Sequence, residues 1–317
     1  MIVAITGASG FIGKKLALKH IALGDQVRFL TRNRNSLNML SGAIGFLGDI
    51  TVPSENIHKF IQGADVLYHL AAEISDENIM WRVNVDGTRN LLNLAEGKIG
   101  CWVQLSSTGV YGQPDKGVIT EESVLNPYNP YEVSKAEADK LVFEFCKQNN
   151  IAGCILRPSN VFGPEMPNQS LFQLINIIDK GLFLFVGDKG AIANYIYVDN
   201  VIDALICCSK DLPYKSKEFS SYIISDYCTM EKMVEVIALS LDKEPPRLRL
   251  PKGPLRALAL IAEKVPGIPL KRSRIDAITS RVIYSHQQLQ DVYGFCNQVS
   301  IEDGFRALVA EWKKPNG

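Results

Sequence analysis

Short runs of apolar, β-branched residues alternate with longer stretches of helical periodicity along the first half of the chain. The first run, Ile2–Thr6, is followed by a helical pattern at Phe11–Leu23 and by a second apolar run at Gln26–Leu30. This alternation is typical of βαβ units, whose strands are buried on both faces of a parallel sheet. The same pattern predicts strands at Ala43–Leu47, Ala64–Leu70, Cys101–Ser106 and Ala152–Leu156, and helices at Ser54–Ile61, Ile79–Ala95 and Tyr131–Gln148.

The rhythm changes beyond Pro158. A helix is predicted near Leu171–Lys180 and another at Asp199–Ser209, and the chain then breaks into shorter mixed elements with many prolines. We therefore expect an α/β protein with a Rossmann-type doubly wound parallel sheet and a smaller C-terminal α/β substrate lobe. The expected dinucleotide-binding domain comprises residues 1–165, with 194–226 returning to it, and the substrate-binding lobe comprises residues 166–193 and 227–317.

Composition argues against several functional classes. The 317 residues include 34 Lys and Arg against 34 Asp and Glu, so no overall charge favours nucleic acid as a partner. No apolar run approaches the roughly 18 residues of a transmembrane segment, and the first strand begins at Ile2, which leaves no room for a signal peptide. We expect a cytoplasmic protein. Its seven cysteines lack C-x-x-C spacing, which predicts reduced core thiols and no metal site.

A glycine-rich turn follows the first strand directly and opens the first helix, with the sequence Thr6-Gly7-Ala8-Ser9-Gly10-Phe11-Ile12-Gly13. Glycines here permit a tight turn, close approach of a pyrophosphate and close packing of helix on strand. The helix N-terminus adds amide donors and a positive dipole. The position between strand and helix predicts dinucleotide binding.

The end of the second strand bears on which dinucleotide is bound. An Asp or Glu there accepts a hydrogen bond from a free ribose 2′-hydroxyl, whereas a cation pairs with a 2′-phosphate. The chain has Arg32, with Arg34 nearby and no competing carboxylate. NADP(H) is therefore favoured over NAD(H), which stays possible.

The motif Tyr131-Glu132-Val133-Ser134-Lys135 begins a predicted helix and places a phenol and an ammonium on one face. A tyrosine pKa near 10 is too high for free proton exchange at neutral pH, and an adjacent Lys⁺ favours the phenolate. Tyr131 could then exchange the proton while a hydride moves to or from a nicotinamide. Tyr128 is a weaker candidate because Glu132 follows it at the corresponding spacing.

Three features in the same order resemble the extended branch of the short-chain dehydrogenase/reductase superfamily: the G-x-x-G-x-x-G turn, the strand end Ser106-Ser107-Thr108-Gly109-Val110-Tyr111-Gly112, and the Tyr131/Lys135 helix. Leu156–Pro164 and Tyr197–Val201 also match family segments. The resemblance implies that Ser107 polarises the substrate oxygen and that Lys135 binds the nicotinamide ribose. Implied cofactor contacts are Gly7, Ser9, Gly10, Phe11, Ile12, Gly13, Arg32, Asp49, Ile50, Leu70, Ala71, Ala72, Tyr131, Lys135 and Pro158. Implied substrate contacts are Ser107, Thr108, Asn160 and Arg274.

The resemblance also narrows the reaction. Sugar 4,6-dehydratases carry Asp-Glu after the catalytic hydroxyl, where this chain has Thr108 and Gly109, which cannot exchange protons at neutral pH. We expect an NADP(H)-dependent oxidoreductase that reduces the 4-keto group of a nucleotide sugar. The alternatives are a nucleotide-sugar 4-epimerase and, in another class, a non-catalytic NADP-binding regulatory protein. The family commonly forms homodimers through paired helices.

One departure concerns the diphosphate. Epimerases resembling this chain carry an Arg where it has Ala193-Asn194. Basic residues of the late segment, including Arg274, could substitute. Alternatively this segment is a solvated basic face, or Leu255–Val265 rests on a membrane surface near a lipid-linked or sterol-like substrate.

Overall fold

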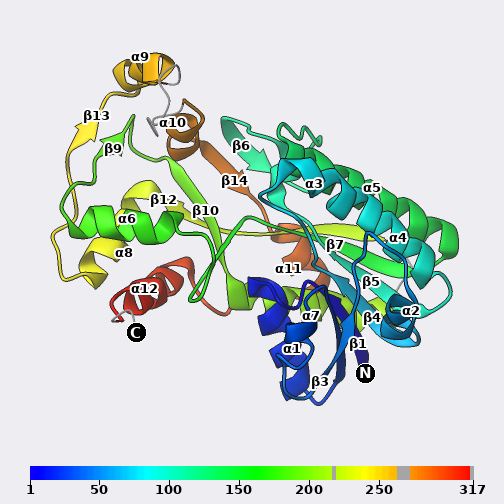
Figure 1. Ribbon diagram of the computed structural model, residues 1–317. Coiled ribbons are helices and arrows are strands. Elements are labelled where there is room, and N and C mark those ends of the chain that lie inside the picture. Colours follow the sequence, from blue (N-terminus) through cyan, green and yellow to red (C-terminus); the bar gives the residue numbers. More distant parts are fainter. Residues whose placement is uncertain (216–218, 263–271, 315–317) are drawn as a thin grey trace.

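The computed structural model describes residues 1–215, 219–262 and 272–314. Its centre is a seven-stranded sheet with the order β11-β7-β5-β4-β1-β2-β3, in which all neighbouring strands run parallel (Figure 1). The strands are β1 (Ile2–Thr6), β2 (Gln26–Thr31), β3 (Ala43–Leu47), β4 (Ala64–His69), β5 (Ile99–Leu105), β7 (Ala152–Pro158) and β11 (Ser220–Ile224).

Helices cover both faces of this sheet. One face packs against α1 (Phe11–Ala22), α7 (Val198–Lys215) and α11 (Gln287–Tyr293). The other packs against α2 (Glu55–Ile61), α4 (Gly87–Ala95) and α5 (Pro130–Asn149). Covering both faces explains why the strands read as continuous apolar runs.

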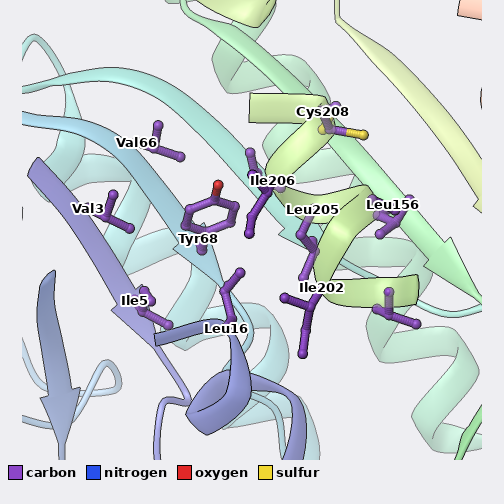
Figure 2. Packing of buried hydrophobic residues seen from close by; sticks show 14 of the residues in the cluster. Val3, Ile5, Leu16, Val66, Tyr68, Leu156, Ile202, Leu205, Ile206 and Cys208 are labelled. Carbon is purple, nitrogen blue, oxygen red and sulfur yellow. The ribbon is translucent and has the colours of Figure 1, made fainter. Parts of the chain in front are cut away.

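The core on the first face is built where α1 and α7 meet the sheet. Figure 2 shows Leu16 of α1 and Ile202 and Leu205 of α7 directed toward Ile5 and Tyr68 on the strands. All five side chains are buried. This packing fixes the start of α1 against the end of β1, where the glycine turn lies.

The order of the strands places the turn at a functional position. The chain moves outward from β1 to β2 and β3, and then crosses back to β4 on the other side of β1. Ligands of doubly wound sheets bind outside the carboxyl ends of the strands at such a reversal. The loops after β1 and β4 border it. This confirms the predicted fold class.

A smaller lobe lies beside the sheet, at the left of Figure 1. Its core is formed largely by residues of α6, α8 and α12 with Phe162 and Ala193. Its elements are the three-stranded sheet β8 (Asn160–Phe162), β10 (Ile192–Tyr197) and β12 (Asp226–Thr229), the two-stranded pair β9 (Phe185–Val186) and β13 (Arg249–Leu250), and the helices α6 (Ser170–Asp179), α8 (Met230–Ser240), α9 (Lys252–Ala262), α10 (Arg272–Ile278) and α12 (Ile301–Trp312).

Three features differ from the pattern-based expectation. The predicted helix Ile79–Ala95 is divided into α3 (Glu77–Trp81), a π-helical turn at Arg82–Asp86, and α4. A strand that periodicity did not indicate, β6 (Lys116–Ile119), pairs with β14 (Arg281–Tyr284) from far along the chain. Finally, α11 lies in the range expected for the lobe but packs on the main sheet. All three depend on contacts that are distant in sequence.

Candidate active site

The glycine turn after β1 depends on having no side chains. Gly7 has φ +74°, and a Cβ there would lie 2.7 Å from the backbone nitrogen of Ala71. A Cβ at Gly13 would lie 2.2 Å from the carbonyl oxygen of Gly7. The turn is thus pressed between the loop after β4 and the first turn of α1, with Gly10 as the N-cap. This is the cradle that a pyrophosphate requires at a helix N-terminus.

Two cavities meet at this turn, and both are lined by Gly7, Gly10, Leu70 and Ala72. The smaller one, about 200 Å³, extends toward the ends of β2 and β3. The larger, about 740 Å³, extends toward α5 and the lobe and is called the catalytic cleft below. An elongated ligand bound across the turn would occupy both. The arrangement therefore fits a dinucleotide, with one nucleoside on each side of the pyrophosphate.

The smaller cavity contains the residues expected around the adenosine. Its lining includes Ser9, Arg32, Asp49, Ile50 and Ala71. The Oδ1 atom of Asp49 accepts hydrogen bonds from the backbone N–H and the hydroxyl of Thr51, which fixes the carboxylate. Arg32 is exposed at the rim.

The Glu73 carboxylate lies close enough to Arg32 for their charges to interact. The backbone N–H groups of Ser75 and Asp76 lower the pKa of the Glu73 carboxyl, and the Arg32 guanidinium lowers it further. In the described part of the chain Arg32 makes no ion pair within 4 Å. Its guanidinium can therefore pair with an anionic ligand at the rim of the smaller cavity.

The catalytic cleft brings together the three residues predicted to perform the chemistry. Ser107, Tyr131 and Lys135 all line it, together with Phe11, Ile12, Gly13 and Pro158 from the predicted cofactor set. Ser107 lies just beyond the end of β5, and its Oγ accepts the N–H of Gly109 at 3.0 Å. Tyr131 and Lys135 lie in the first turns of α5, which begins with a capping box between Asn129 and Glu132.

The Tyr131 phenol is protonated at neutral pH. Burial, helped by the negative charge of Asp139, raises its pKa to about 12, although a hydrogen bond with Ser107 acts in the opposite direction. The Lys135 Nζ donates to the Leu105 carbonyl oxygen at 2.6 Å, which fixes the ammonium beside the end of β5.

A buried carboxylate behind the site was not anticipated from the sequence. The Asp139 Oδ2 accepts hydrogen bonds from the Ser106 hydroxyl at 2.8 Å and from Arg157 Nε at 3.1 Å, and its Oδ1 is buried without a partner. Burial lowers the pKa of Lys135, and the Asp139 carboxylate opposes this shift. Asp139 follows Lys135 by four residues on α5, a spacing that could have identified it. The Asp139 carboxylate joins α5 to Ser106, just beyond the end of β5, and to Arg157 of β7.

His69, at the end of β4, takes part in a hydrogen-bond network with assignable protons. Thr6 Oγ1 accepts the N–H groups of the two residues after His69 at 3.2 Å, so its hydroxyl donates to His69 Nδ1 at 2.7 Å. Thr88 donates to the Asn84 carbonyl at 2.6 Å and therefore accepts from His69 Nε2 at 2.9 Å. Burial lowers the pKa of His69 to about 3. The ring is neutral and positions the loop after β1.

Asn84 extends this hydrogen-bond network to α5. It lies in the π-helical turn, and its Nδ2 donates to the Glu73 carbonyl and, at 3.0 Å, to Ser134 Oγ. The Ser134 hydroxyl donates in turn to the Tyr131 carbonyl oxygen at 2.8 Å. Side chains thus link the loops after β1 and β4 to the backbone of Tyr131.

The predicted substrate contacts fall in different places. Asn160 lies at the cleft, and its Nδ2 donates to the Asn194 carbonyl oxygen. Thr108 is buried, is not among the cleft-lining residues, and hydrogen-bonds with Tyr284. Arg274 belongs to α10, but its side chain lies outside the described part of the structure. The described residues contain no cluster of His, Cys, Asp or Glu suited to a metal ion.

Comparison with known proteins gives a family match. The family described as NAD dependent epimerase/dehydratase matches residues 3–216. The low-salt glycan biosynthesis protein Agl12 of Haloferax volcanii is 29% identical to this chain, covering 77% of it and 84% of the relative. The N-acetyl-alpha-D-glucosaminyl-diphospho-ditrans,octacis-undecaprenol 4-epimerase of Escherichia coli O157:H7 is 27% identical, covering 78% of this chain and 75% of the relative.

Solved structures show the same fold. The UDP-glucuronic acid 4-epimerase of Bacillus cereus, in complex with UDP-glucuronic acid and NAD, superposes with a TM-score of 0.76 at 22% identity. The match covers 99% of both chains, so the lobe is included as well as the sheet.

Proposed function

The chain belongs to the NAD dependent epimerase/dehydratase family and is an enzyme of the extended short-chain dehydrogenase/reductase type, and from this premise we propose that it uses NADP(H) to reduce the 4-keto group of a sugar. Its substrate class would be a nucleotide sugar. The observation that carries the proposal is the convergence of Ser107, Tyr131 and Lys135 in the cleft that adjoins the glycine turn.

The protonation of Tyr131 supports reduction. A bound NADPH supplies the hydride. A ketone that accepts it develops negative charge on oxygen and must receive a proton. A phenol with a pKa of about 12 carries that proton at neutral pH, and Ser107 is hydrogen-bonded to the phenol, where it can hold the substrate oxygen beside it. Lys135 is held in place by its bond to Leu105, and it would hold the ribose of a bound cofactor.

The preference for NADP(H) is supported by Arg32. Its guanidinium lines the smaller cavity near Ser9, where a ribose 2′-phosphate would be bound. NAD(H) is the alternative cofactor, since the family match is compatible with either. Net reduction consumes NADPH. A preference for NADP(H) and a reaction in the direction of reduction therefore support each other.

A 4-epimerase is the second candidate. It oxidises and re-reduces the same carbon with retained NAD, so it requires the same three residues. The E. coli relative is named as a 4-epimerase and the B. cereus structure as a UDP-glucuronic acid 4-epimerase, which favours this reading. The two reactions differ in one observable, because only the reductase consumes NADPH in proportion to product.

The test combines a substrate panel with a tyrosine variant. Purified enzyme is incubated with NADPH and nucleotide 4-ketosugars while absorbance of NADPH is followed. Tyr131→Phe should lower turnover by about a hundredfold or more while leaving NADPH affinity within about twofold, because only the proton donor is lost. Tyr128→Phe, at an exposed position, is the matched control and should behave as wild type.

The outcomes separate the candidate functions. Interconversion of 4-epimers without net NADPH loss would replace the reductase by the epimerase. A protein that binds NADPH but shows the same low activity with and without the Tyr131 hydroxyl would be a regulatory NADP-binding protein, the third candidate.

A further inference from the structure

Helix α5 turns one row of side chains toward the end of β5. Tyr131, Lys135 and Asp139 follow one another at intervals of four residues, which places them on a single helix face. Tyr131 and Lys135 line the catalytic cleft, whereas Asp139 does not. Asp139 is only 2% exposed. The third member of the row is thus a buried charged group that the proposed reaction does not use.

Three consecutive residues at the end of β5 bond to this row. The middle one, Ser106, donates its hydroxyl to the Asp139 Oδ2 at 2.8 Å. On one side of it, the Leu105 carbonyl oxygen accepts the Lys135 Nζ at 2.6 Å. On the other side, the Ser107 hydroxyl is hydrogen-bonded to the phenol of the row. The bond at Ser106 therefore lies between the two bonds that hold the residues of the cleft.

Arg157 fixes the Asp139 side chain from β7. Its Nε donates to the Asp139 Oδ2 at 3.1 Å, so one carboxylate oxygen accepts both Ser106 and Arg157. The guanidinium is held in turn by Tyr111, whose hydroxyl accepts its Nη1 at 2.9 Å and whose ring lies 5.3 Å below it. Both members of the ion pair are buried.

Stability alone does not account for this ion pair. Apolar residues of the same volume would stabilise the fold about as well, because both charges lose their hydration on burial. What the pair adds is geometry, since its hydrogen bonds fix the position of α5 relative to β5 and β7. The position that it fixes is the one on which the distance between Ser107 and Tyr131 depends.

We propose that Asp139 is a positioning residue, which holds the end of β5 against α5 through Ser106 and so keeps Ser107 beside Tyr131. The inference rests on the proposed reaction, for which a proton donor and an oxygen-binding hydroxyl must stay together. Asp139 acts through these residues and does not line the cleft itself. Loss of its bond to Ser106 should lower kcat and leave cofactor affinity unchanged, because the glycine turn is held by other contacts.

The charge of Asp139 has a second, electrostatic effect on the row. Burial raises the pKa of Tyr131, and the negative charge of Asp139 raises it further. Burial lowers the pKa of Lys135, and the same charge opposes that shift. Removing the charge should therefore lower both pKa values.

Other charged or titratable groups face this network from each element around it. They are Glu132 on α5, Arg157 on β7, Tyr111 in the turn Thr108–Tyr111, Glu121 after β6, His69 on β4 and Tyr284 on β14. Each of them is common to wild type and to the variants below, so differences between these proteins report on Asp139 and Ser106.

Ser106→Ala tests the positioning role, because it removes the bond to Asp139 and leaves Ser107 and every charge in place. A displacement of about 1 Å in an active site costs about a hundredfold in rate, so this loosening should lower kcat by about tenfold. NADPH affinity should stay within about twofold. The matched control is Ser209→Ala, which removes a buried hydroxyl that bonds to Tyr68 and Ile206 in the core and should keep wild-type kcat.

Variants of Asp139 test whether the two residues act together. Asp139→Asn should lower kcat further and move the alkaline limit of the reduction to lower pH, whereas Asp139→Glu should keep the wild-type limit because it keeps the charge. The double variant Ser106→Ala/Asp139→Asn should have the kcat of Asp139→Asn, since the shared bond is lost only once. If Asp139→Asn does not fold, the comparison of Ser106→Ala with Ser209→Ala still decides.

Ionisation of Tyr131 provides a test without turnover. After a rapid jump to alkaline pH, tyrosinate absorbance is compared between each protein and the same protein with Tyr131→Phe. The Ser107 bond lowers the Tyr131 pKa, so Ser106→Ala, like Ser107→Ala, should leave a smaller ionised fraction than wild type. Asp139→Asn should leave a larger one, because a negative charge is gone.

Two results would overturn the proposal: wild-type kcat or wild-type Tyr131 ionisation in Ser106→Ala, or losses that simply add in the double variant. A loss of kcat in Ser209→Ala as large as that in Ser106→Ala would also do so, since it would reveal a general effect of core serines. If wild type reduces no ketosugar, the proposed function fails, and the ionisation experiment still decides whether Asp139 positions Ser107.

Discussion

At the scale of single side chains, we propose that residues around the glycine turn and the cleft select the cofactor and carry the transferred proton. We propose that the cofactor preference depends on Arg32, because it lines the smaller cavity and makes no ion pair within 4 Å in the described chain. A guanidinium paired with a 2′-phosphate through charge-assisted hydrogen bonds contributes about 1.5–3 kcal/mol.

Replacing Arg32 should therefore change cofactor selectivity. We expect Arg32→Ala to weaken NADPH binding by about tenfold or more and to leave NADH binding nearly unchanged. Arg34→Ala is the control, since Arg34 is exposed nearby but does not line the cavity. Fluorescence titration of both reduced cofactors measures the four affinities. If the Arg32 variant lost equal affinity for NADPH and NADH, the side chain would not distinguish a 2′-phosphate from a 2′-hydroxyl.

His69 should make stability depend on pH. An unfolded histidine binds a proton below about pH 6.5, whereas the folded His69 does so only near pH 3, so the unfolded state holds more protons between these values. The free energy of unfolding should thus fall as pH drops below about 6.5, by up to about 1.4 kcal/mol per pH unit.

Urea unfolding of wild type and His69→Gln at pH 7, 6 and 5 measures this contribution. The variant should be less stable at pH 7, because it disturbs the bonds with Thr6 and Thr88, but should lose less stability on acidification. Identical pH slopes for the two proteins would contradict the assignment of a neutral, buried imidazole. His20, which is also buried, is common to both proteins and does not affect the difference.

Some of these side-chain roles could be predicted from the sequence, and others could not. Ser107, Tyr131 and Lys135 were predictable because their chemistry requires particular residue types at fixed spacings, and the structure brings all three to one cleft. The hydrogen bonds of Asp139 were not, since its partners are distant in sequence: Ser106 lies just beyond β5 and Arg157 lies on β7. The protonation of Tyr131 was not either, because burial, which dominates its pKa, depends on the whole fold.

Among the secondary-structure elements, the junction of β1 with α1 is tightly constrained by close packing. Gly13, in the first turn of α1, lies so near the Gly7 carbonyl oxygen that a methyl group would have to displace backbone. Because the same carbonyl accepts the N–H of Gly10, displacing it would reshape the phosphate cradle itself.

Gly13→Ala should accordingly reduce NADPH affinity by about tenfold or more and lower the melting temperature. The matched control is Gly253→Ala in α9, where a Cβ would meet open space. Thermal shift and cofactor titration on both variants test this. A Gly13 variant that binds NADPH as wild type would show that the turn can adjust without cost to the site.

The βαβ elements themselves followed from periodicity, because strands covered on both faces and helices with one buried side leave clear patterns. The π-helical turn at Arg82–Asp86 left none. It arises where Asn84 bonds to the loop after β4 and to α5, a tertiary constraint that hydrophobic spacing does not encode. The pairing of β6 with β14 joins segments more than a hundred residues apart and was equally hidden.

For the whole molecule, the family resemblance suggested a homodimer through paired helices, and we propose that α4 and α5 are these helices. Phe143 of α5 is 43% exposed, which leaves an aromatic side chain available on the outer face of that helix. A negative charge there should shift the protein toward monomer.

Sedimentation velocity of wild type, Phe143→Glu and the control Leu23→Glu tests this assembly at micromolar concentration. Leu23 is similarly exposed but follows α1, away from α4 and α5. The wild type and the Leu23 variant should sediment as dimers, and the Phe143 variant mainly as a monomer. A monomeric wild type would remove the proposal.

The proposed reduction of a 4-ketosugar is tested most directly by tracing the hydride from NADPH into the product. The enzyme is given NADPH deuterated at the transferring C4 position together with a 4-ketosugar, and the product is analysed by mass spectrometry. We expect one deuterium in each product molecule, with equal loss of NADPH, and almost no product from Tyr131→Phe. A product free of deuterium, or undiminished transfer by the Tyr131 variant, would contradict it.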